Sequence, residues 1–254
     1  DGKTDLMMMY RDPNSSAVSI YHWNADGLYP DLVSSFTNGL GVKAEINYQS
    51  ITDNSVYTKD AGVEAASYPY MDVQAPSYVV VSVSSSDGIG GTNTNTYHYG
   101  GLKQHHAAGS SLGFRWMQAT DPAGLVHVTY NNQNREVGTD GTVALTQTFA
   151  GSVAVKQVSN TWVNRASTGT CSLRPQTQLT SSTETTRELN NTVVASVTTT
   201  NTYDSCGYPT QTVVDMGGGH KKTTVNQYTH DTTNWRLGLV TRTDVTSEAP
   251  GQTA

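Results

Sequence analysis

Short segments in which Val, Leu or Tyr alternates with Thr, Ser or Asn recur along most of the chain. Successive side chains of a strand point to opposite faces, so this alternation predicts strands with one face in water. Gly, Asp and Asn separate the segments, as tight turns require. The pattern predicts five antiparallel hairpins, which join 79–84 to 92–99, 112–119 to 125–130, 143–149 to 153–163, 178–189 to 192–203, and 210–214 to 222–228.

Helix signals are scarce by comparison. The best candidate is a short helix over 30–38, with Asp31 near its start and Gly39 as its stop. The connections between strands are short, so sequential strands are expected to be neighbours. The sequence therefore predicts an all-β fold of successive antiparallel hairpins, stacked as a β-sheet shell or solenoid-like wall, with few or no helices.

The composition excludes several classes of protein. Charged residues make up 14% of the chain and the net charge is −6, which gives no overall electrostatic attraction to nucleic acid. No stretch approaches the roughly 18 apolar residues that a membrane-spanning helix needs. Aromatic and β-branched residues are too frequent for a disordered chain. We therefore expect a folded β protein without a nucleic-acid partner and without a membrane span.

A spaced pattern repeats near the C-terminal end. Residues 198–211 hold a Thr-rich strand, the pair Tyr203-Asp204, a turn with Gly207 and a returning strand, and residues 223–231 echo this order. A tyrosine ring can cover an apolar face while its hydroxyl stays hydrated, and an aspartate can bond the backbone of a turn. Such units cannot bury their faces alone, so we expect them to stack.

This pattern resembles the YD repeat of the Rhs family. The wider sequence is similar to the SpvB-like branch and to the B component of insecticidal toxin complexes. Besides the Tyr203-Asp204 repeat, the motifs that carry this resemblance lie at 26–32, 37–44, 109–116 and 231–235. Two residues depart from the family pattern: Cys206 in the turn, and Tyr208 where a small polar residue is expected.

The resemblance implies an architecture in which an FG-GAP-like propeller precedes a middle region and YD repeats then build a β shell. On this basis we expect the end of a propeller-like region at 1–35, a middle β region at 36–170 and YD-repeat-like hairpins at 171–254. The start at Asp1, inside a motif, favours a piece of a longer protein.

The resemblance also implies a function. Enzymatic activities of the family lie in variable C-terminal domains, and the Glu-x-Glu motif of the ADP-ribosyltransferase type is absent from this sequence. We therefore expect a non-catalytic structural segment of a bacterial toxin or surface protein, secreted or at the cell surface. Its partners would be other regions of the same longer polypeptide and other toxin-complex components.

An alternative function is an extracellular glycan- or partner-binding β module of the adhesin or lectin type. The candidate binding residues are Tyr97, Tyr99 and Trp116, which lie on expected strands. Exposed and coplanar rings would favour binding, whereas buried rings would favour a purely architectural role.

Calcium is the one cofactor that the sequence suggests. Residues 1–6 resemble the second half of an FG-GAP-type calcium loop, and Asn24, Asp26 and Asp31 form a second near-match. Alternating carboxylate and amide oxygens suit the six to eight hard ligands of Ca²⁺. The second loop has one extra residue, and His22 stands where an acid is expected. The competing interpretation is a turn in which Asp26 and Asp31 cap backbone amides.

Cys171 and Cys206 allow one pairing. A disulfide between them would close a loop of about 35 residues and would fit an oxidising or extracellular setting. Two unrelated thiols are an equally good interpretation of the sequence.

Two further motifs lack the context that their chemistry needs. Residues 109–113 match the Gly-x-Ser-x-Gly elbow, which lifts its serine on a strand-to-helix turn, but an alternating strand pattern follows Ser111. His105 and His106 are adjacent, so on a strand they point to opposite faces and cannot chelate one ion together, even with His98 nearby. We therefore expect neither a hydrolase nor a zinc site.

Overall fold

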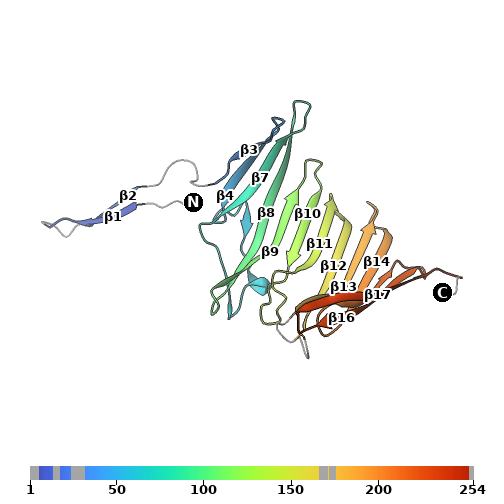
Figure 1. The fold of residues 1–254 in the computed structure, drawn as a ribbon. Helices are drawn as coiled ribbons and strands as arrows, with labels where there is room; N and C mark the ends of the chain where they lie inside the picture. Colours follow the sequence, from blue (N-terminus) through green and yellow to red (C-terminus); the bar gives the residue numbers. More distant parts are fainter. Residues whose placement is uncertain (1–5, 14–17, 24–31, 166–170, 172–175, 252–254) are drawn as a thin grey trace.

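The computed structural model describes residues 6–13, 18–23, 32–165, 171 and 176–251. Regular structure in this part of the chain is almost entirely strand, and η1 (Gly62–Glu64) is a single 3₁₀ turn. None of the described helical residues forms a helix that is long and apolar enough to cross a membrane. The strands (Figure 1) are β1 (Leu6–Arg11), β2 (Val18–Trp23), β3 (Ser35–Thr37), β4 (Lys43–Ser50), β5 (Tyr57–Thr58), β6 (Tyr70–Asp72), β7 (Tyr78–Ser86), β8 (Thr92–His105), β9 (Ser110–Thr120), β10 (Val126–Asn131), β11 (Val143–Ala150), β12 (Val153–Arg165), β13 (Gln176–Arg187), β14 (Val193–Tyr203), β15 (Pro209–Asp215), β16 (Lys221–Asp231) and β17 (Arg236–Glu248).

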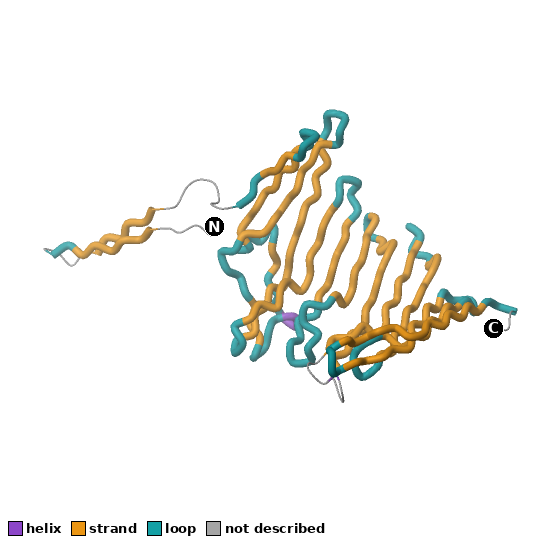
Figure 2. The backbone as a smooth tube through the Cα atoms, in the orientation of Figure 1, coloured by secondary structure: helices purple, strands orange, loops and turns teal. Residues whose placement is uncertain are grey.

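Fifteen of these strands form one open sheet. Its order is β17-β16-β15-β14-β13-β12-β11-β10-β9-β8-β7-β4-β3, with β5 and β6 also paired to β8. All pairs are antiparallel except β5 with β8. The sheet curves, so that β16 and β17 lie across the view while β9 to β12 stand upright (Figures 1 and 2). Strands β1 and β2 form a separate hairpin, and neither contacts another strand of the described residues.

The all-β prediction is confirmed, and each of the five predicted hairpins is present as an adjacent antiparallel pair. The predicted helix over 30–38 is wrong. Within it, Ser35–Thr37 is strand β3 and pairs with β4, while residues 30 and 31 lie outside the described part. The side chain of Asn38 accepts hydrogen bonds from the backbone amides of Leu40 and Val42, which closes a hairpin instead of ending a helix.

Four hairpin turns in the described part of the chain share one construction, in which Asn or Asp stands first and Gly stands fourth. The Oδ1 atom of the first residue accepts hydrogen bonds from the amides two and four residues later, at 2.8–3.0 Å. The fourth residue has a φ between +81° and +96°, which favours glycine. The turns begin at Asn38, Asp87, Asp121 and Asp204, and their glycines are Gly41, Gly90, Gly124 and Gly207.

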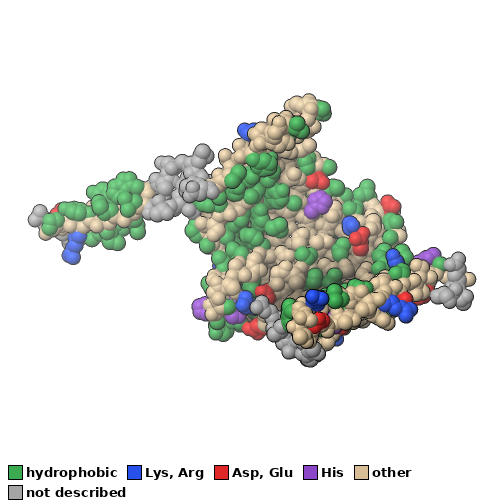
Figure 3. Space-filling model, in the orientation of Figure 1, with side chains coloured by type: hydrophobic (Ala, Val, Ile, Leu, Met, Phe, Trp, Pro, Cys, Tyr) green, Lys and Arg blue, Asp and Glu red, His purple; other side chains and the backbone are tan. Residues whose placement is uncertain are grey.

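The main hydrophobic core lies where β5 pairs with β8. Ile51 and Tyr57 are fully buried there, and Tyr99 is 7% exposed. The Tyr57 hydroxyl donates to the carbonyl of Val73 (2.8 Å) and accepts from the amide of Leu102 (3.0 Å), so its polar end is satisfied inside the core. Figure 3 shows hydrophobic side chains gathered over β4, β7 and β8, and mostly polar ones toward β17.

A buried ion cluster fastens the segment after β5 to the sheet. The Asp60 carboxylate, whose side chain is 2% exposed, accepts hydrogen bonds from Nε (2.8 Å) and Nη2 (2.6 Å) of Arg115, and Lys103 Nζ lies 3.2 Å away. Burial alone would raise the pKa of Asp60, but the hydrogen bonds from Arg115 and Lys103 outweigh it and hold that pKa below its usual range.

Candidate functional site

The candidate calcium ligands Asn24, Asp26 and Asp31 lie outside the described residues. The calcium site therefore stays a prediction from the sequence.

The three candidate binding aromatics take part in packing. Tyr99 belongs to the core, and its hydroxyl donates to the carbonyl of Val80 at 2.8 Å. Tyr97 is half-buried against the same core. Trp116 stacks on His98, with ring centroids 5.4 Å apart and planes inclined by 10°. It also covers Gly100, where a Cβ atom would overlap its ring. These positions favour an architectural role for the three rings over a shared exposed platform.

Ser111 and the histidines have ordinary structural surroundings. Ser111 lies within β9 opposite Gln104 of β8, and its hydroxyl accepts from the amide of Gly113 at 3.2 Å. The ring of His105 lies against Tyr70, and the ring of His106 lies against Tyr68. The strand-to-helix turn of a nucleophile elbow is replaced here by continuous strand.

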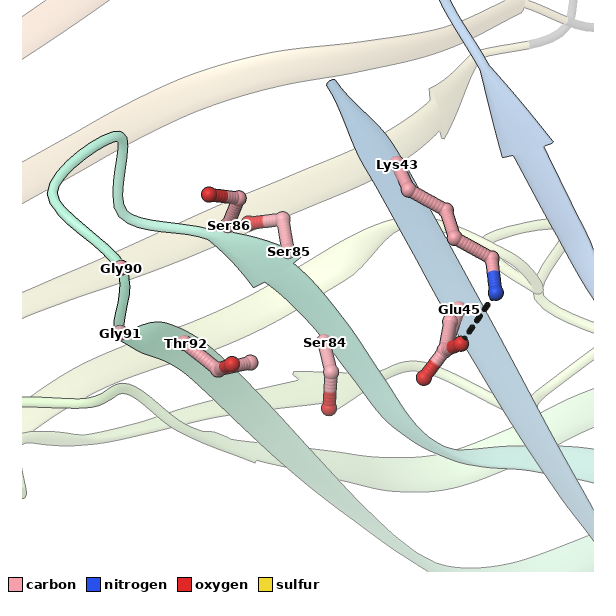
Figure 4. A pocket seen from close by; sticks show the side chains of 8 residues that line it. All are labelled: Lys43, Glu45, Ser84, Ser85, Ser86, Gly90, Gly91 and Thr92. Carbon is pink, nitrogen blue, oxygen red and sulfur yellow. Dashed lines mark hydrogen bonds and ion pairs between the residues drawn. The ribbon is translucent and has the colours of Figure 1, made fainter. Parts of the chain in front are cut away.

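A shallow hollow of about 260 Å³ lies at the ends of β4, β7 and β8 (Figure 4). Its charged residues are Lys43 and Glu45, which pair at 2.5 Å. The hydrogen bond from Lys43 holds the pKa of Glu45 below its usual range. The other lining residues are Ser84, Ser85, Ser86, Gly90, Gly91 and Thr92. A solvated ion pair beside serine hydroxyls, without a histidine or cysteine in the lining, offers no activated nucleophile.

The turn after Tyr203 and Asp204 is fastened by a disulfide. Cys171 and Cys206 are bonded, with Cα atoms 5.0 Å apart, and both residues are buried. This separation is ordinary for a disulfide. The Gln176 side chain donates to the carbonyl of Cys206 at 3.0 Å, so β13 also holds the turn. Of the two interpretations that the sequence leaves open, the structure has the bonded one.

Asp204 connects this turn to strand β16. Its Oδ1 caps the turn, while its Oδ2 lies 2.9 Å from Nε2 of His230. The amide of Gly238 donates to His230 Nδ1 at 3.1 Å, so the ring proton of neutral His230 must be on Nε2, where it is donated to Asp204. Tyr208 packs on Gly238, where a Cβ would overlap its ring. The unexpected tyrosine is thus matched by a glycine two strands away.

One group of described residues has the composition of a metal site: Cys171, Cys206 and His230, whose potential ligand atoms lie within 4.8 Å of one another. The thiolate is the form of cysteine that binds metals, and both sulfurs are joined in the disulfide. Both ring nitrogens of His230 are engaged as well. The two sulfurs and both His230 nitrogens are therefore already engaged in contacts that hold the turn.

Within the described strands, an Asn-x-aromatic ladder links neighbouring strands in three places. In each, the Asn amide and the aromatic residue two positions later donate to one carbonyl of the preceding strand, at 2.7–3.3 Å. A register shift toward the following strand falls immediately before the aromatic residue. Asn160 and Trp162 donate to the carbonyl of Val143, Asn201 and Tyr203 donate to that of Leu179, and Asn226 and Tyr228 donate to that of Pro209.

Two copies of the ladder lie in the segment where the sequence pattern predicts repeats, and the copy at Asn160 lies outside it. Asn-Thr-Trp at 160–162 has the same spacing as Asn-Thr-Tyr at 201–203. A pattern that requires tyrosine does not detect this copy, because tryptophan stands in its place.

The fold is similar to solved insecticidal toxin structures. A chain of the Photorhabdus luminescens Tc holotoxin pore matches with a TM-score of 0.67 and 12% identity over 96% of this chain and 16% of that chain. The TcdB2-TccC3 crystal structure matches with a TM-score of 0.61 and 12% identity over 84% of this chain and 15% of that chain. This chain thus corresponds to about one sixth of the length of those chains. A search of curated proteins found no match.

A family comparison covers more than half of the chain. Residues 1–147 match the family described as the insecticide toxin TcdB middle/N-terminal region. This match agrees with the toxin-complex fold of the solved structures and with the resemblance to a toxin-complex B component that the sequence motifs carry. The chain therefore belongs to the family of the insecticide toxin TcdB middle/N-terminal region.

Proposed function

We propose that this chain is a non-catalytic structural segment of a secreted bacterial toxin of the Rhs/SpvB-like type, linking a propeller to a YD-repeat shell. The observation that carries the proposal is the continuous open sheet from β3 to β17. Its hairpins are interlocked by the ladder and by capped turns, which makes a wall without assembling catalytic groups. The similarity of this fold to toxin-complex chains supports the same role.

The hairpin β1–β2 supports the propeller end of this proposal. Directly opposed residues share a face, so Leu6 lies with Trp23 on one face, and Met9 lies with Ile20 on the other. These four side chains are 48% to 69% exposed in this chain. Apolar residues on both faces are typical of strands that are covered on both sides. We infer that residues 1–35 complete a propeller-like region formed with other parts of a longer polypeptide.

The opposite end of the sheet supports continuation into a shell. Within the described residues, β17 pairs only with β16, and it extends over Arg236–Glu248. Such a long free edge carries unpaired amides and carbonyls, which pair readily with another strand. We propose that the YD-repeat hairpins of 171–254 continue across this edge, and that the middle region 36–170 joins the two ends. The β12–β13 pair joins the strands on either side of residue 170, so one continuous sheet spans both proposed regions. The two regions are therefore distinguished by their sequence patterns and not by a break in the sheet.

The test is an experimental structure of a longer toxin polypeptide that contains this segment. We expect a further strand bonded to β17 and side chains packed on both faces of β1–β2. A β17 edge that borders solvent in the complete assembly would contradict the proposal. As a functional control, Ser111→Ala is expected to leave toxin activity unchanged, because Ser111 has only structural contacts.

A further inference from the structure

A small polar hollow lies across three consecutive strands in the half of the sheet nearer β17. Its volume is about 200 Å³, below the 300–1,000 Å³ that is usual for drug-sized ligands. This size suits a single sugar or a small organic acid. The lining residues are Arg165 of β12, Gln178 and Thr180 of β13, and Asn201, Thr202 and Tyr203 of β14.

Gln178 is the unusual residue of this hollow. It is only 6% exposed, and its Oε1 atom is buried without a hydrogen-bond partner in the structure. Buried polar atoms are nearly always paired, because an unpaired one keeps the full penalty of leaving water. An orphaned acceptor at the wall of a hollow therefore indicates a place for a donor from outside the chain.

The neighbouring side chains do not supply that donor. The Tyr203 hydroxyl and the Asn201 amide both donate to the carbonyl of Leu179, at 2.7 and 3.1 Å. The Thr180 hydroxyl donates to the carbonyl of Thr161 at 3.1 Å. The two strongest donors beside Gln178 are thus held by the ladder, and the polar lining is fixed in place.

Arg165 supplies the charge of the hollow. It is exposed, and among the described residues no carboxylate forms an ion pair with it. A guanidinium group binds a carboxylate through two parallel hydrogen bonds. Beside it, the Tyr203 ring gives a half-buried apolar surface on which C–H groups can pack. An exposed cation, a buried glutamine and an aromatic ring thus line one small volume.

From this arrangement we propose that the hollow binds a carboxylated sugar of the hexuronate type. The carboxylate pairs with Arg165, and the ring C–H groups pack on Tyr203. Gln178 Oε1 is closed to solvent in the free chain, so binding turns the Gln178 side chain toward the hollow, where Oε1 accepts from a sugar hydroxyl. The site differs from the Tyr97, Tyr99 and Trp116 platform considered from the sequence. It is a property of this chain alone, so its failure would leave the proposed scaffold role untouched.

The test is an NMR titration of the 254-residue chain with glucuronate, with glucose and acetate as matched probes. We expect saturable shifts of the Gln178 side-chain amide with glucuronate, and at least tenfold weaker responses to glucose, which lacks the carboxylate, and to acetate, which lacks the hydroxyls. Arg165→Gln is expected to weaken glucuronate binding at least tenfold. Arg236→Gln, another exposed arginine, is the control and is expected to bind as the unaltered chain does.

Gln178→Met gives a second, independent measurement. It removes the orphaned acceptor, so it is expected to abolish glucuronate binding and to raise the Tm of the unliganded chain by about 2–4 °C. A lowered Tm would mean that the amide is already satisfied in the free chain and would overturn the proposal. Equal shifts with all three probes, or unchanged glucuronate binding by Arg165→Gln, would overturn it as well.

Discussion

Asp204→Asn is the substitution that most sharply tests how the hairpins are joined. An asparagine keeps the Oδ1 acceptor for the turn amides, as Asn38 demonstrates in its own turn. It replaces Oδ2 with an NH₂ group, which then faces the N–H of His230 Nε2 at the position of the present 2.9 Å hydrogen bond. His230 cannot move its proton to Nδ1, because the amide of Gly238 already donates there.

The expected loss of folding free energy is that of the hydrogen bond between Asp204 and His230. A hydrogen bond to a charged group contributes about 1.5–3 kcal/mol, and both side chains are about one-fifth exposed, so solvent cannot replace it fully. For a chain of this size, each kcal/mol lowers the Tm by about 2–4 °C, so the expected loss is about 3–12 °C. Thermal unfolding followed by circular dichroism measures it.

Asp87→Asn is the matched control. Asp87 occupies the same position in its turn, and Oδ1 alone accepts from Ile89 and Gly91, so the amide group meets no competing donor. Its substitution is expected to change stability by less than about 0.5 kcal/mol, as exposed replacements usually do. Equal effects of Asp204→Asn and Asp87→Asn would refute the idea that Asp204 couples its turn to strand β16.

Three other predictions concern the core and the ladder. Asp60→Asn removes the buried carboxylate that neutralises the partly buried Arg115 and Lys103, which keep only weaker contacts with Glu64. The change is expected to cost about 3 kcal/mol in urea unfolding at pH 7. Because the folded-state pKa of Asp60 is lowered, its stabilisation is complete above the unfolded pKa of about 3.9 and is lost as the pH falls through the lower folded value; a gap between the two proteins that persists at lower pH would contradict this. Gly100→Ala is expected to displace the Trp116 ring and to change tryptophan fluorescence, whereas an unchanged spectrum would argue against the contact. Trp162→Phe removes the donor to Val143 and is expected to cost about 1 kcal/mol; a cost no larger than that of Trp235→Phe, at an exposed position, would count against the ladder.

The sequence predicted the repetitive part of the fold well, because alternation is a local signal. Val79–Ser84 and its partner strand each carry their own face pattern, and Asp87 with Gly90 marks the turn between them. The alternation pattern does not predict strand β1 (Leu6–Arg11), because its consecutive apolar side chains lie on both faces of the strand. Gly39 misled the helix prediction, since a glycine can end a helix and can also stand in a hairpin turn such as the one that Asn38 closes.

The side-chain contacts that hold the strands together were harder to predict than the strands, because they join residues far apart in the chain. Nothing near Asp60 indicates that Arg115 will neutralise it, and nothing near Tyr208 indicates that Gly238 will make room for its ring. The cysteines limited the pairing to one choice but could not show that a bond forms. The structure adds the reason that the turn after Asp204 tolerates Cys206: the sulfur is buried in a disulfide.

The central claim is that this open sheet is one part of a wall whose edges are completed by neighbouring segments. Hydrogen exchange followed by mass spectrometry tests it most directly, by comparing this chain alone with the same residues inside an assembled toxin complex. We predict that amides of β17 and of the β1–β2 hairpin exchange quickly in the isolated chain and become protected on assembly, while β9–β12 are protected in both. Equally fast exchange of β17 in both states would contradict the account.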